Sequence, residues 1–340
     1  ELLMLPLFFI SLALLFKRRL LMKKVFILCL FLLSNAFAKQ WVYSKLNGKK
    51  IPQLWNGDDI INTIVVAVID TGVDYTHPDL SSNIWLNEVE ANGIAGVDDD
   101  GNGYVDDIRG YDFATSSPDP MDLLGHGTHV AGIIAAKRDG QGITGLNPYA
   151  KIMALKSFTE KSGDIAHSIE AIYYAVDNGA HIINCSWIER KKSYELEKAV
   201  EYAISKGVII VAGAGNSGQN LNRKHRYLAE FDDVISVANI NSGGAIVSRS
   251  NFGSRKIDIA APGNYILSTI PRGGYGHKSG TSMSSPFVAG AISLLLSLEN
   301  GHDLNSIKER LYRTGKKSRH YRKKLISEKR IDVYEFIKGK

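Results

Sequence analysis

Cysteine is scarce in this sequence, which has two, Cys29 and Cys185, among 340 residues. Cys29 lies in an apolar stretch near the N-terminus, and removal of that stretch would leave Cys185 alone. A lone cysteine excludes an intramolecular disulfide, even in an oxidising compartment. Because Cys185 comes just after the apolar Ile182 and Ile183, we expect a buried structural thiol rather than a catalytic one.

Proline and charge of one sign are also limited. With 9 Pro, 32 Gly, 44% hydrophobic and 22% charged residues, the composition is that of a globular protein and excludes collagen-like, low-complexity and disordered chains. The net charge of +6 is modest, and no basic stripe alternates with aromatic residues, so no nucleic-acid partner is expected. No Gly-x-Gly-x-x-Gly follows the first predicted strand, which disfavours a dinucleotide-binding enzyme.

A short apolar run precedes residue 39. Val25–Leu33 follows Lys23 and Lys24, and the segment ends in an Ala-x-Ala pattern at Ala38. These are the parts of a secretory signal peptide, and the run is shorter than the roughly 20 residues that a spanning helix needs. We therefore predict a signal peptide at 22–38 and a secreted protein, extracellular or periplasmic, that contacts the membrane only before cleavage.

Residues 1–21 contain another apolar run, and the sequence begins with Glu1 rather than Met. We interpret this piece as translation upstream of a true start at Met22, outside the mature protein. The alternative is that the N-terminus is retained as a membrane anchor.

From about residue 60, strand-like runs alternate with helical stretches. Ile64–Ile69 is an unbroken apolar run, typical of a strand buried on both faces. Such alternation predicts a parallel sheet with helices on both faces, with sites where strands end and helices begin. Further strands are predicted at Lys151–Leu155, His181–Asn184, Val208–Val211, Val234–Ala238 and Ile257–Ala260, and helices at Thr128–Ala136, Ile165–Asn178, Tyr194–Lys206 and Pro286–Leu298.

Two segments place reactive side chains at such an edge. Asp70 opens an Asp-Thr-Gly motif directly after the first strand, although an Asp before a Gly is also an ordinary turn residue. His126 lies in Gly-His-Gly-Thr-His at 125–129, where the glycines allow other backbone to approach the ring. A metal site at His126 and His129 is disfavoured, because their spacing is i, i+3 and no nearby Glu completes a zinc-protease helix.

A third segment, Gly-Thr-Ser-Met-Ser-Ser-Pro at 280–286, precedes a strongly apolar helical stretch. The hydroxyl and the backbone N–H of Ser282 would then lie near the positive end of a helix dipole. That position suits a nucleophile whose reaction develops an oxyanion. Taken alone, the motif is equally typical of an N-capping serine.

In the order Asp, His, Ser, the three motifs resemble the signatures of subtilisin-family serine proteases, the subtilases. Ala-Gly-Ala-Gly-Asn-Ser-Gly at 212–218 resembles the segment that presents the oxyanion-hole Asn of that family. The resemblance runs from about Trp41 to the end. It implies a subtilisin-like three-layer α/β fold, with a central, mostly parallel sheet and helices on both faces, in one catalytic domain over residues 39–340.

The resemblance implies a secreted serine endopeptidase that hydrolyses polypeptide substrates through an acyl-enzyme intermediate. Ser282 would attack, His126 would take its proton, and Asp70 would orient the imidazole. The Asn216 amide and the Ser282 N–H would donate to the oxyanion. A monomer without an organic cofactor is expected. The alternative is a subtilase-like binding or structural protein with little or no turnover.

The family resemblance also implies a substrate-binding region made of two segments. Its expected members are Ser186, Trp187, Ile188, Gly213, Ala214 and Gly215. The first segment usually continues as Ser-x-Gly-Gly in the family, but here Ile188 and Glu189 replace the glycines. We therefore expect a narrowed pocket for the residue before the cleaved bond.

An acidic run at 98–107 follows the opening of an EF-hand calcium loop, with Gly103 at the sharp turn. The twelfth position is Arg109 rather than Glu, so a true EF-hand is not expected, and a solvated acidic turn is the alternative. Similar insertions in subtilases bind calcium, and the resemblance therefore implies structural calcium. The expected ligands are Asp98, Asp100, Asn102, Tyr104 and Asp106, with a second, weaker site at Asp79 and Asp139.

Overall fold

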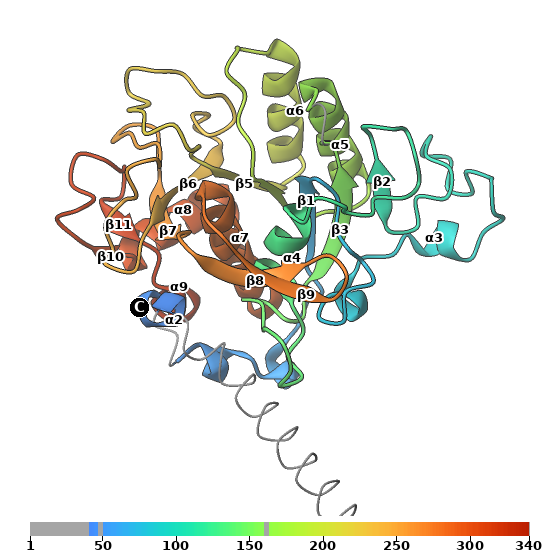
Figure 1. Ribbon diagram of the computed structural model, residues 1–340, viewed down its shortest axis with the longest axis horizontal. Helices are drawn as coiled ribbons and strands as arrows, with labels where there is room; N and C mark the ends of the chain where they lie inside the picture. Colours follow the sequence, from blue (N-terminus) through green and yellow to red (C-terminus); the bar gives the residue numbers. More distant parts are fainter. Residues whose placement is uncertain (1–40, 47–49, 160–162, 340) are drawn as a thin grey trace, which may run out of the picture.

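The computed structural model describes residues 41–46, 50–159 and 163–339, so the predicted signal peptide and the segment before it lie outside the described residues. A nine-stranded sheet with the order β10-β11-β7-β6-β5-β4-β1-β3-β2 forms the middle layer, with helices on both faces (Figure 1). Neighbouring strands are parallel except for β10, which pairs antiparallel with β11. The predicted three-layer α/β fold is confirmed.

The elements alternate along the chain as the sequence pattern predicts. The sheet strands are β1 Val65–Asp70, β2 Gly110–Asp112, β3 Lys151–Lys156, β4 Ile182–Cys185, β5 Ile209–Gly213, β6 Val234–Ile240, β7 Ile259–Pro262, β10 Lys316–Lys317 and β11 Lys329–Arg330. A separate hairpin consists of β8 Ile266–Ile270 and β9 Gly274–Lys278. The α-helices are α2 Trp41–Lys45, α3 Glu88–Ala91, α4 Gly127–Ala135, α5 Ile165–Asp177, α6 Tyr194–Ser205, α7 Thr281–Leu298, α8 Leu304–Thr314 and α9 Val333–Lys338; short 3-10 turns lie at Ile51–Leu54, Gly57–Asp59 and Ser81–Asn83.

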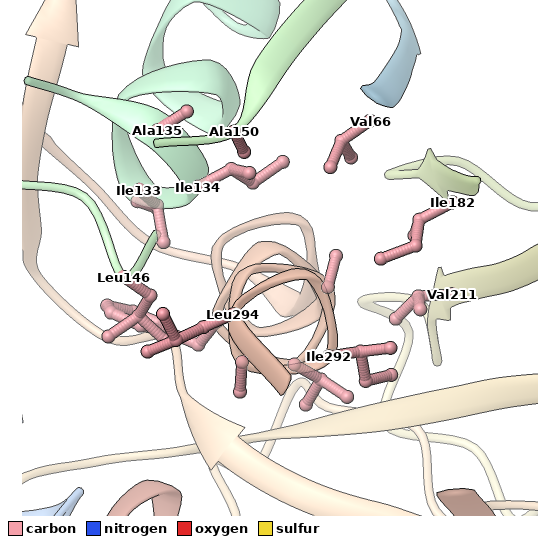
Figure 2. Packing of buried hydrophobic residues seen from close by; sticks show 14 of the residues in the cluster. Val66, Ile133, Ile134, Ala135, Leu146, Ala150, Ile182, Val211, Ile292 and Leu294 are labelled. Atoms are coloured by element: carbon pink, nitrogen blue, oxygen red, sulfur yellow. The ribbon is translucent and has the colours of Figure 1, made fainter. Parts of the chain in front are cut away.

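The central strand β1 shows why its sequence is apolar without interruption. Val66 and Val68 belong to the hydrophobic cluster that contains α4 and α7, whereas Ala67 and Ile69 belong to the cluster of α5 and α6. Successive side chains of a strand point to opposite faces, so a strand covered on both faces needs apolar residues at every position. Figure 2 shows the α4–α7 side of this packing, with Val66, Ile182 and Val211 directed towards α7.

Helix α7 begins at Thr281, so the prediction that it begins at Pro286 is wrong. A proline inside a helix removes one backbone hydrogen bond, to the carbonyl four residues earlier. That carbonyl belongs to Ser282, and it accepts a hydrogen bond from the Ser186 hydroxyl instead, at 3.1 Å. Helix α7 is long and apolar enough to cross a membrane by composition, but 89% of it is buried inside the protein, as in a core helix.

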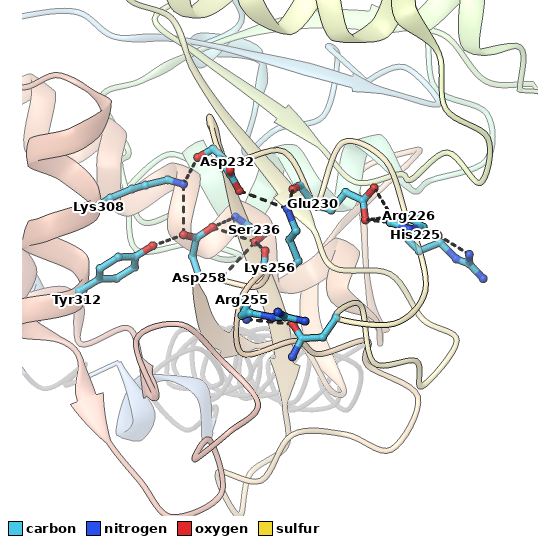
Figure 3. A network of polar contacts seen from close by, with 11 residues as sticks. His225, Arg226, Glu230, Asp232, Ser236, Arg255, Lys256, Asp258, Lys308 and Tyr312 are labelled. Carbon is cyan, nitrogen blue, oxygen red and sulfur yellow. Dashed lines mark hydrogen bonds and ion pairs between the residues drawn. The ribbon is translucent and has the colours of Figure 1, made fainter.

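A polar network attaches helix α8 to the sheet (Figure 3). Asp258, 2% exposed, accepts hydrogen bonds at Oδ2 from the backbone N–H and the hydroxyl of Ser236, at 2.8 and 2.9 Å. Its Oδ1 receives the Tyr312 hydroxyl and lies 3.3 Å from Lys308 Nζ. Because Lys308 and Tyr312 are one turn apart on α8, this single carboxylate holds one face of the helix.

Candidate active site

The carboxyl ends of β1 and β4 lie side by side. Asp70 is the last residue of β1, and Ser186 follows Cys185, the last residue of β4. Ile69 and Cys185 are register partners in the parallel ladder. Because adjacent strands are about 4.8 Å apart, Asp70 and Ser186 leave the sheet as neighbours. This is the edge at which sites form in parallel sheets.

The Asp70 carboxylate is buried and holds His126. Asp70 is 3% exposed, and its Oδ1 lies 2.7 Å from His126 Nδ1 and accepts the Thr71 N–H at 2.8 Å. The negative charge of Asp70 raises the pKa of His126 above its ordinary value, against the opposing effect of burial. In the described part of the chain, Nε2 of His126 has no hydrogen-bond partner, so it is available as a proton acceptor.

Two glycines allow this close approach. A Cβ on Gly127 would lie 2.0 Å from the Gly72 carbonyl oxygen and 3.0 Å from Asp70 Cβ. A Cβ on Gly72, whose φ is +94°, would lie 2.2 Å from the Pro120 carbonyl oxygen. The N-terminus of α4 can therefore meet the end of β1 only if position 127 lacks a side chain, and the loop at Pro120 can approach it only if position 72 does.

Asp122, which the sequence analysis missed, connects the two motifs. This fully buried carboxylate accepts hydrogen bonds at Oδ1 from the Thr71 hydroxyl and the Gly125 N–H, at 2.9 and 2.8 Å. Its Oδ2 accepts the hydroxyl and the N–H of Thr128, at 2.6 and 2.9 Å. In the sequence, Asp122 is an aspartate outside the recognised motifs, so only the fold reveals that it positions the segment around His126.

His129 has a structural role. It is fully buried, and its Nε2 donates to the carbonyls of Ile266 and Gly276 in the β8–β9 hairpin, at 2.9 and 3.1 Å. Burial lowers the pKa of His129 to about 4, so the ring is neutral near pH 7. Among the described residues, neither His126 nor His129 belongs to a cluster of three metal-ligating side chains.

Ser282 is the second residue of α7 and is bonded to Ser186 in both directions. The Ser282 hydroxyl donates to the Ser186 carbonyl, and the Ser186 hydroxyl donates to the Ser282 carbonyl, both at 3.1 Å. Within the described residues, Ser282 makes no hydrogen bond to His126. The structure thus joins His126 to Asp70, and Ser282 to Ser186, at adjacent positions of one sheet edge.

The Asn216 side chain faces the same turn. Its Oδ1 accepts the Thr281 N–H at 2.9 Å, which fixes the orientation of the amide. Nδ2 is then directed to the neighbouring side, where it lies 3.3 Å from the position that a Cβ on Gly280 would take. In the part of the chain that the structure describes, this Nδ2 has no acceptor, so Asn216 presents a free donor beside Ser282.

The two predicted substrate-binding segments lie on either side of Ser282. Ser186, Trp187 and Ile188 are half-buried, and the Trp187 ring centroid lies 6.1 Å from that of Phe158. On the other side, the Gly215 N–H donates to the Thr281 hydroxyl at 3.0 Å. Gly213 approaches the same threonine, whereas the Ala214 side chain is buried in a hydrophobic cluster and faces away from the surface.

The acidic loop at 98–107 is bound to Glu90, a residue that the sequence analysis missed. Carboxylate oxygens of Glu90, Asp98 and Asp100 all lie within 4.8 Å of one another. Glu90 is 4% exposed, and its two oxygens accept the backbone N–H groups of Asp99, Asp100 and Asp106 at 2.7 to 3.1 Å. Glu90 precedes the loop on α3, outside the calcium-loop spacing, so the pattern gave no signal for it.

The other predicted ligands have different positions in this loop. Asn102 donates through Nδ2 to Asp100 and Asp107, at 3.0 and 2.9 Å. Asp106 accepts the Gly96 N–H at 2.8 Å. The Tyr104 hydroxyl donates to Glu170 on α5, so only its backbone carbonyl remains available to the loop.

A buried carboxylate fastens the loop to the protein. Asp107 is fully buried, accepts the Tyr174 hydroxyl of α5 at 2.5 Å and accepts Nδ2 of Asn87 at 2.8 Å. Burial raises the pKa of Asp107. Among the described residues, no Lys, Arg or His forms an ion pair with Glu90 or with the acidic side chains of the loop.

The second predicted calcium site has partners within the protein. Asp79, 1% exposed, accepts the Ile143 N–H and the Tyr275 hydroxyl on one oxygen, both at 2.9 Å. The Asp139 carboxylate lies 2.9 Å from Lys137 Nζ. Calcium binding by Asp79 and Asp139 stays a prediction.

Comparisons with known proteins match most of this chain. The family model described as "Subtilase family" matches residues 62–328. The chain is 41% identical over 234 residues to "Thermophilic serine proteinase" of Bacillus sp. (strain AK1), covering 68% of this chain and 52% of that protein. It is 36% identical over 281 residues to "Subtilisin-like protease 1" of Plasmodium falciparum (isolate 3D7), covering 76% and 41%.

A further relative is "Major intracellular serine protease" of Bacillus subtilis (strain 168), 37% identical over 254 residues, or 74% of this chain and 73% of that protein. This chain therefore belongs to the subtilase family. It spans about half the length of the Bacillus AK1 and Plasmodium relatives that it matches.

Proposed function

We propose that this chain is a serine endopeptidase that hydrolyses peptide bonds in polypeptide substrates. The observation that carries the proposal is the 2.7 Å contact between His126 Nδ1 and the buried Asp70 carboxylate, at the sheet edge that also holds Ser282. A serine hydroxyl is a weak nucleophile near neutral pH, so it needs a base in reach, and that base needs a fixed tautomer. Asp70 fixes the proton on Nδ1 and leaves Nε2 basic.

The first step requires one rotation. When the Ser282 side chain turns from the Ser186 carbonyl towards His126 Nε2, it can pass its proton to the imidazole as Oγ attacks the substrate carbonyl. The imidazolium that forms is stabilised by the negative charge of Asp70. Because His126 Nε2 then carries the proton, it can protonate the departing amine, which leaves an acyl group on Ser282 that water hydrolyses.

Two hydrogen-bond donors would stabilise the negative charge that develops on the substrate carbonyl oxygen. The Ser282 N–H is at the beginning of α7, where the helix dipole also favours negative charge. The free Nδ2 of Asn216 would supply the second hydrogen bond. Its orientation is already fixed by Thr281, so little reorganisation is needed during the reaction.

Two variants of α7 test this proposal. Ser282→Ala is expected to abolish peptide hydrolysis while the protein still folds. Ser293→Ala is the matched control, since Ser293 is a buried serine of the same helix whose hydroxyl donates to the Gly290 carbonyl. Hydrolysis that purified Ser282→Ala retains would show that Ser282 is not the nucleophile. Hydrolysis that is undetectable in the unaltered chain would favour a subtilase-like binding or structural protein.

We also propose a structural calcium ion at the acidic loop. Glu90, Asp98 and Asp100 offer an oxygen-only set, the kind of ligand that Ca²⁺ prefers. Their negative charge has no cationic side chain as a partner among the described residues, which supports the fit. Bound there, calcium would neutralise this charge and cross-link α3 to the loop.

Export is a further proposal, and it rests on the sequence of residues 22–38 alone. Removal of these residues would leave a mature, monomeric chain with Lys39 first. N-terminal sequencing of secreted protein is expected to find Lys39. An intact N-terminus in the membrane fraction would contradict cleavage, and size-exclusion chromatography tests the monomer.

A further inference from the structure

Ser282 lies between two segments that leave neighbouring strands. Cys185 of β4 and Ala212 of β5 are register partners, so the segments that follow them start side by side. On one side, the Ser186 carbonyl accepts the Ser282 hydroxyl at 3.1 Å. On the other, Gly215 N–H donates to Thr281, the residue before Ser282. The space between the two segments therefore opens directly beside the nucleophile.

The residue whose carbonyl is attacked has to cross this space. Its carbonyl oxygen points to Asn216 on the β5 side, as the proposed function requires. Its N–H can reach the Ser186 carbonyl on the β4 side, which becomes free when the Ser282 hydroxyl turns to His126. A residue held at both ends in this way directs its side chain into the gap between the segments.

Ile188 fills that gap. Its Cδ1 lies 2.5 Å from the position that a Cβ on Gly215 would take, so the side chain reaches from the first segment to the backbone of the second. Ile188 also packs against the buried cluster that includes Ala214, Leu221 and Ala229. A side chain larger than a methyl group that enters from Ser282 would meet Ile188.

The backbones of the two segments, at Ile188 and at Gly215, cannot easily move away from each other. The neighbour of Ile188, Glu189, exchanges two backbone hydrogen bonds with Tyr227, at 3.1 and 2.9 Å. Gly215 has a φ of +95°, and its carbonyl accepts the Asn251 N–H at 2.8 Å. With both backbones fixed, a large substrate side chain would have to displace the Ile188 side chain from its cluster.

We propose that Ile188 closes the pocket for the residue before the scissile bond, so that the enzyme cleaves after glycine or alanine. This inference rests on the proposed peptidase function and names its substrate class. Glycine and alanine need no space between the segments, whereas leucine and phenylalanine do.

The test uses the purified full chain and peptides that differ only in the residue before the scissile bond: Gly, Ala, Leu or Phe. For the unaltered protein, kcat/KM is expected to be at least about tenfold higher for Gly and Ala than for Leu and Phe. Ile188→Ala is expected to raise kcat/KM for Leu and Phe by about 10- to 100-fold, because a buried side chain of this size then gains its contacts.

Ile246→Ala is the matched control, because Ile246 is a half-buried isoleucine packed against the same cluster. It should lose similar stability and keep the original preference. Equal or better cleavage after Leu and Phe by the unaltered chain, or the same profile in Ile188→Ala, would overturn the inference while the peptidase function stands. If no peptide is cleaved and a small fluorophosphonate leaves Ser282 unlabelled, the proposed function itself fails, and this inference with it.

Discussion

The Ser186 hydroxyl donates to the Ser282 carbonyl at 3.1 Å, taking the place of the helical N–H that Pro286 lacks. A strand end and a helix start are thereby joined at the residue we propose as nucleophile. The proline is tolerated because the side chain of the residue that follows β4 donates to the carbonyl that the proline leaves free. Ser186 thus positions Ser282, in addition to its proposed place in the substrate site.

This relationship predicts coupling between Ser186 and Pro286. Ser186→Ala is expected to lower the free energy of unfolding by about 1–2 kcal/mol, because the buried Ser282 carbonyl loses its donor. In a Pro286→Ala background, the restored N–H can serve that carbonyl, so the same substitution should cost clearly less. A double-mutant cycle by urea unfolding measures the difference, and strictly additive effects would show that the two residues are independent.

The raised pKa of His126 predicts the acid limb of activity. Only the neutral imidazole can accept the Ser282 proton, so kcat/KM should fall as the pH drops through a pKa above the ordinary value for histidine. Asp70→Asn removes the charge that raises this pKa and should move the midpoint to lower pH. It should also reduce kcat by about 10⁴-fold, since the tautomer is no longer fixed. An unshifted midpoint in kcat/KM against pH would contradict the role of Asp70.

The acidic loop predicts calcium-dependent stability. A Ca²⁺ concentration 100 times the dissociation constant should add about 2.7 kcal/mol to the free energy of unfolding, and a chelator should remove that gain. Glu90→Gln should weaken the effect strongly. Glu88→Gln should not, because Glu88 is an exposed glutamate of the same helix. Thermal unfolding with and without Ca²⁺ measures this effect. If the Tm of the unaltered chain is the same in both conditions, the proposal is contradicted.

The Asp258 network predicts which of two aspartate substitutions near α8 destabilises the protein. Asp258→Ala removes the ion-pair partner of the largely buried Lys308, which keeps only the Asp232 carbonyl among the described residues, and it removes the acceptor of the Ser236 N–H. It should therefore lower the free energy of unfolding by about 3–5 kcal/mol. Asp232→Ala is the control: its side chain is 89% exposed, and its contact with Lys256 is a surface pair worth at most about 1 kcal/mol. If denaturant unfolding shows the same loss of unfolding free energy for both variants, α8 is held to the sheet by other contacts.

Much of the fold could be predicted because the apolar residues of β1 and its neighbouring strands indicate directly that these strands are buried. Apolar residues at every position of Val65–Ile69 require cover on both faces, and this gives the layers directly. The start of α7 could not be predicted in the same way. A proline normally marks a helix start, and its tolerance at position 286 depends on Ser186, which lies 96 residues before Ser282 in the chain.

The site shows the same limit. Asp70, His126 and Ser282 lie in motifs dense with glycine and therefore stand out. Asp122 and Glu90 are buried carboxylates whose partners come from segments that only the fold assembles, and neither lies in a recognisable pattern. The sequence predicts a narrowed pocket at Ile188, because Ile188 stands where the family usually has glycine. The close approach of Ile188 to Gly215, by which we propose that the pocket is closed, can be found only in the folded structure.

The most direct test of the central claim is the rate at which a fluorophosphonate modifies the folded chain, with the adduct located by peptide mass spectrometry. The account predicts a single adduct on Ser282 and a rate that falls by about 10²- to 10⁴-fold in His126→Ala. An adduct elsewhere, or a rate at Ser282 that does not depend on His126, would contradict it.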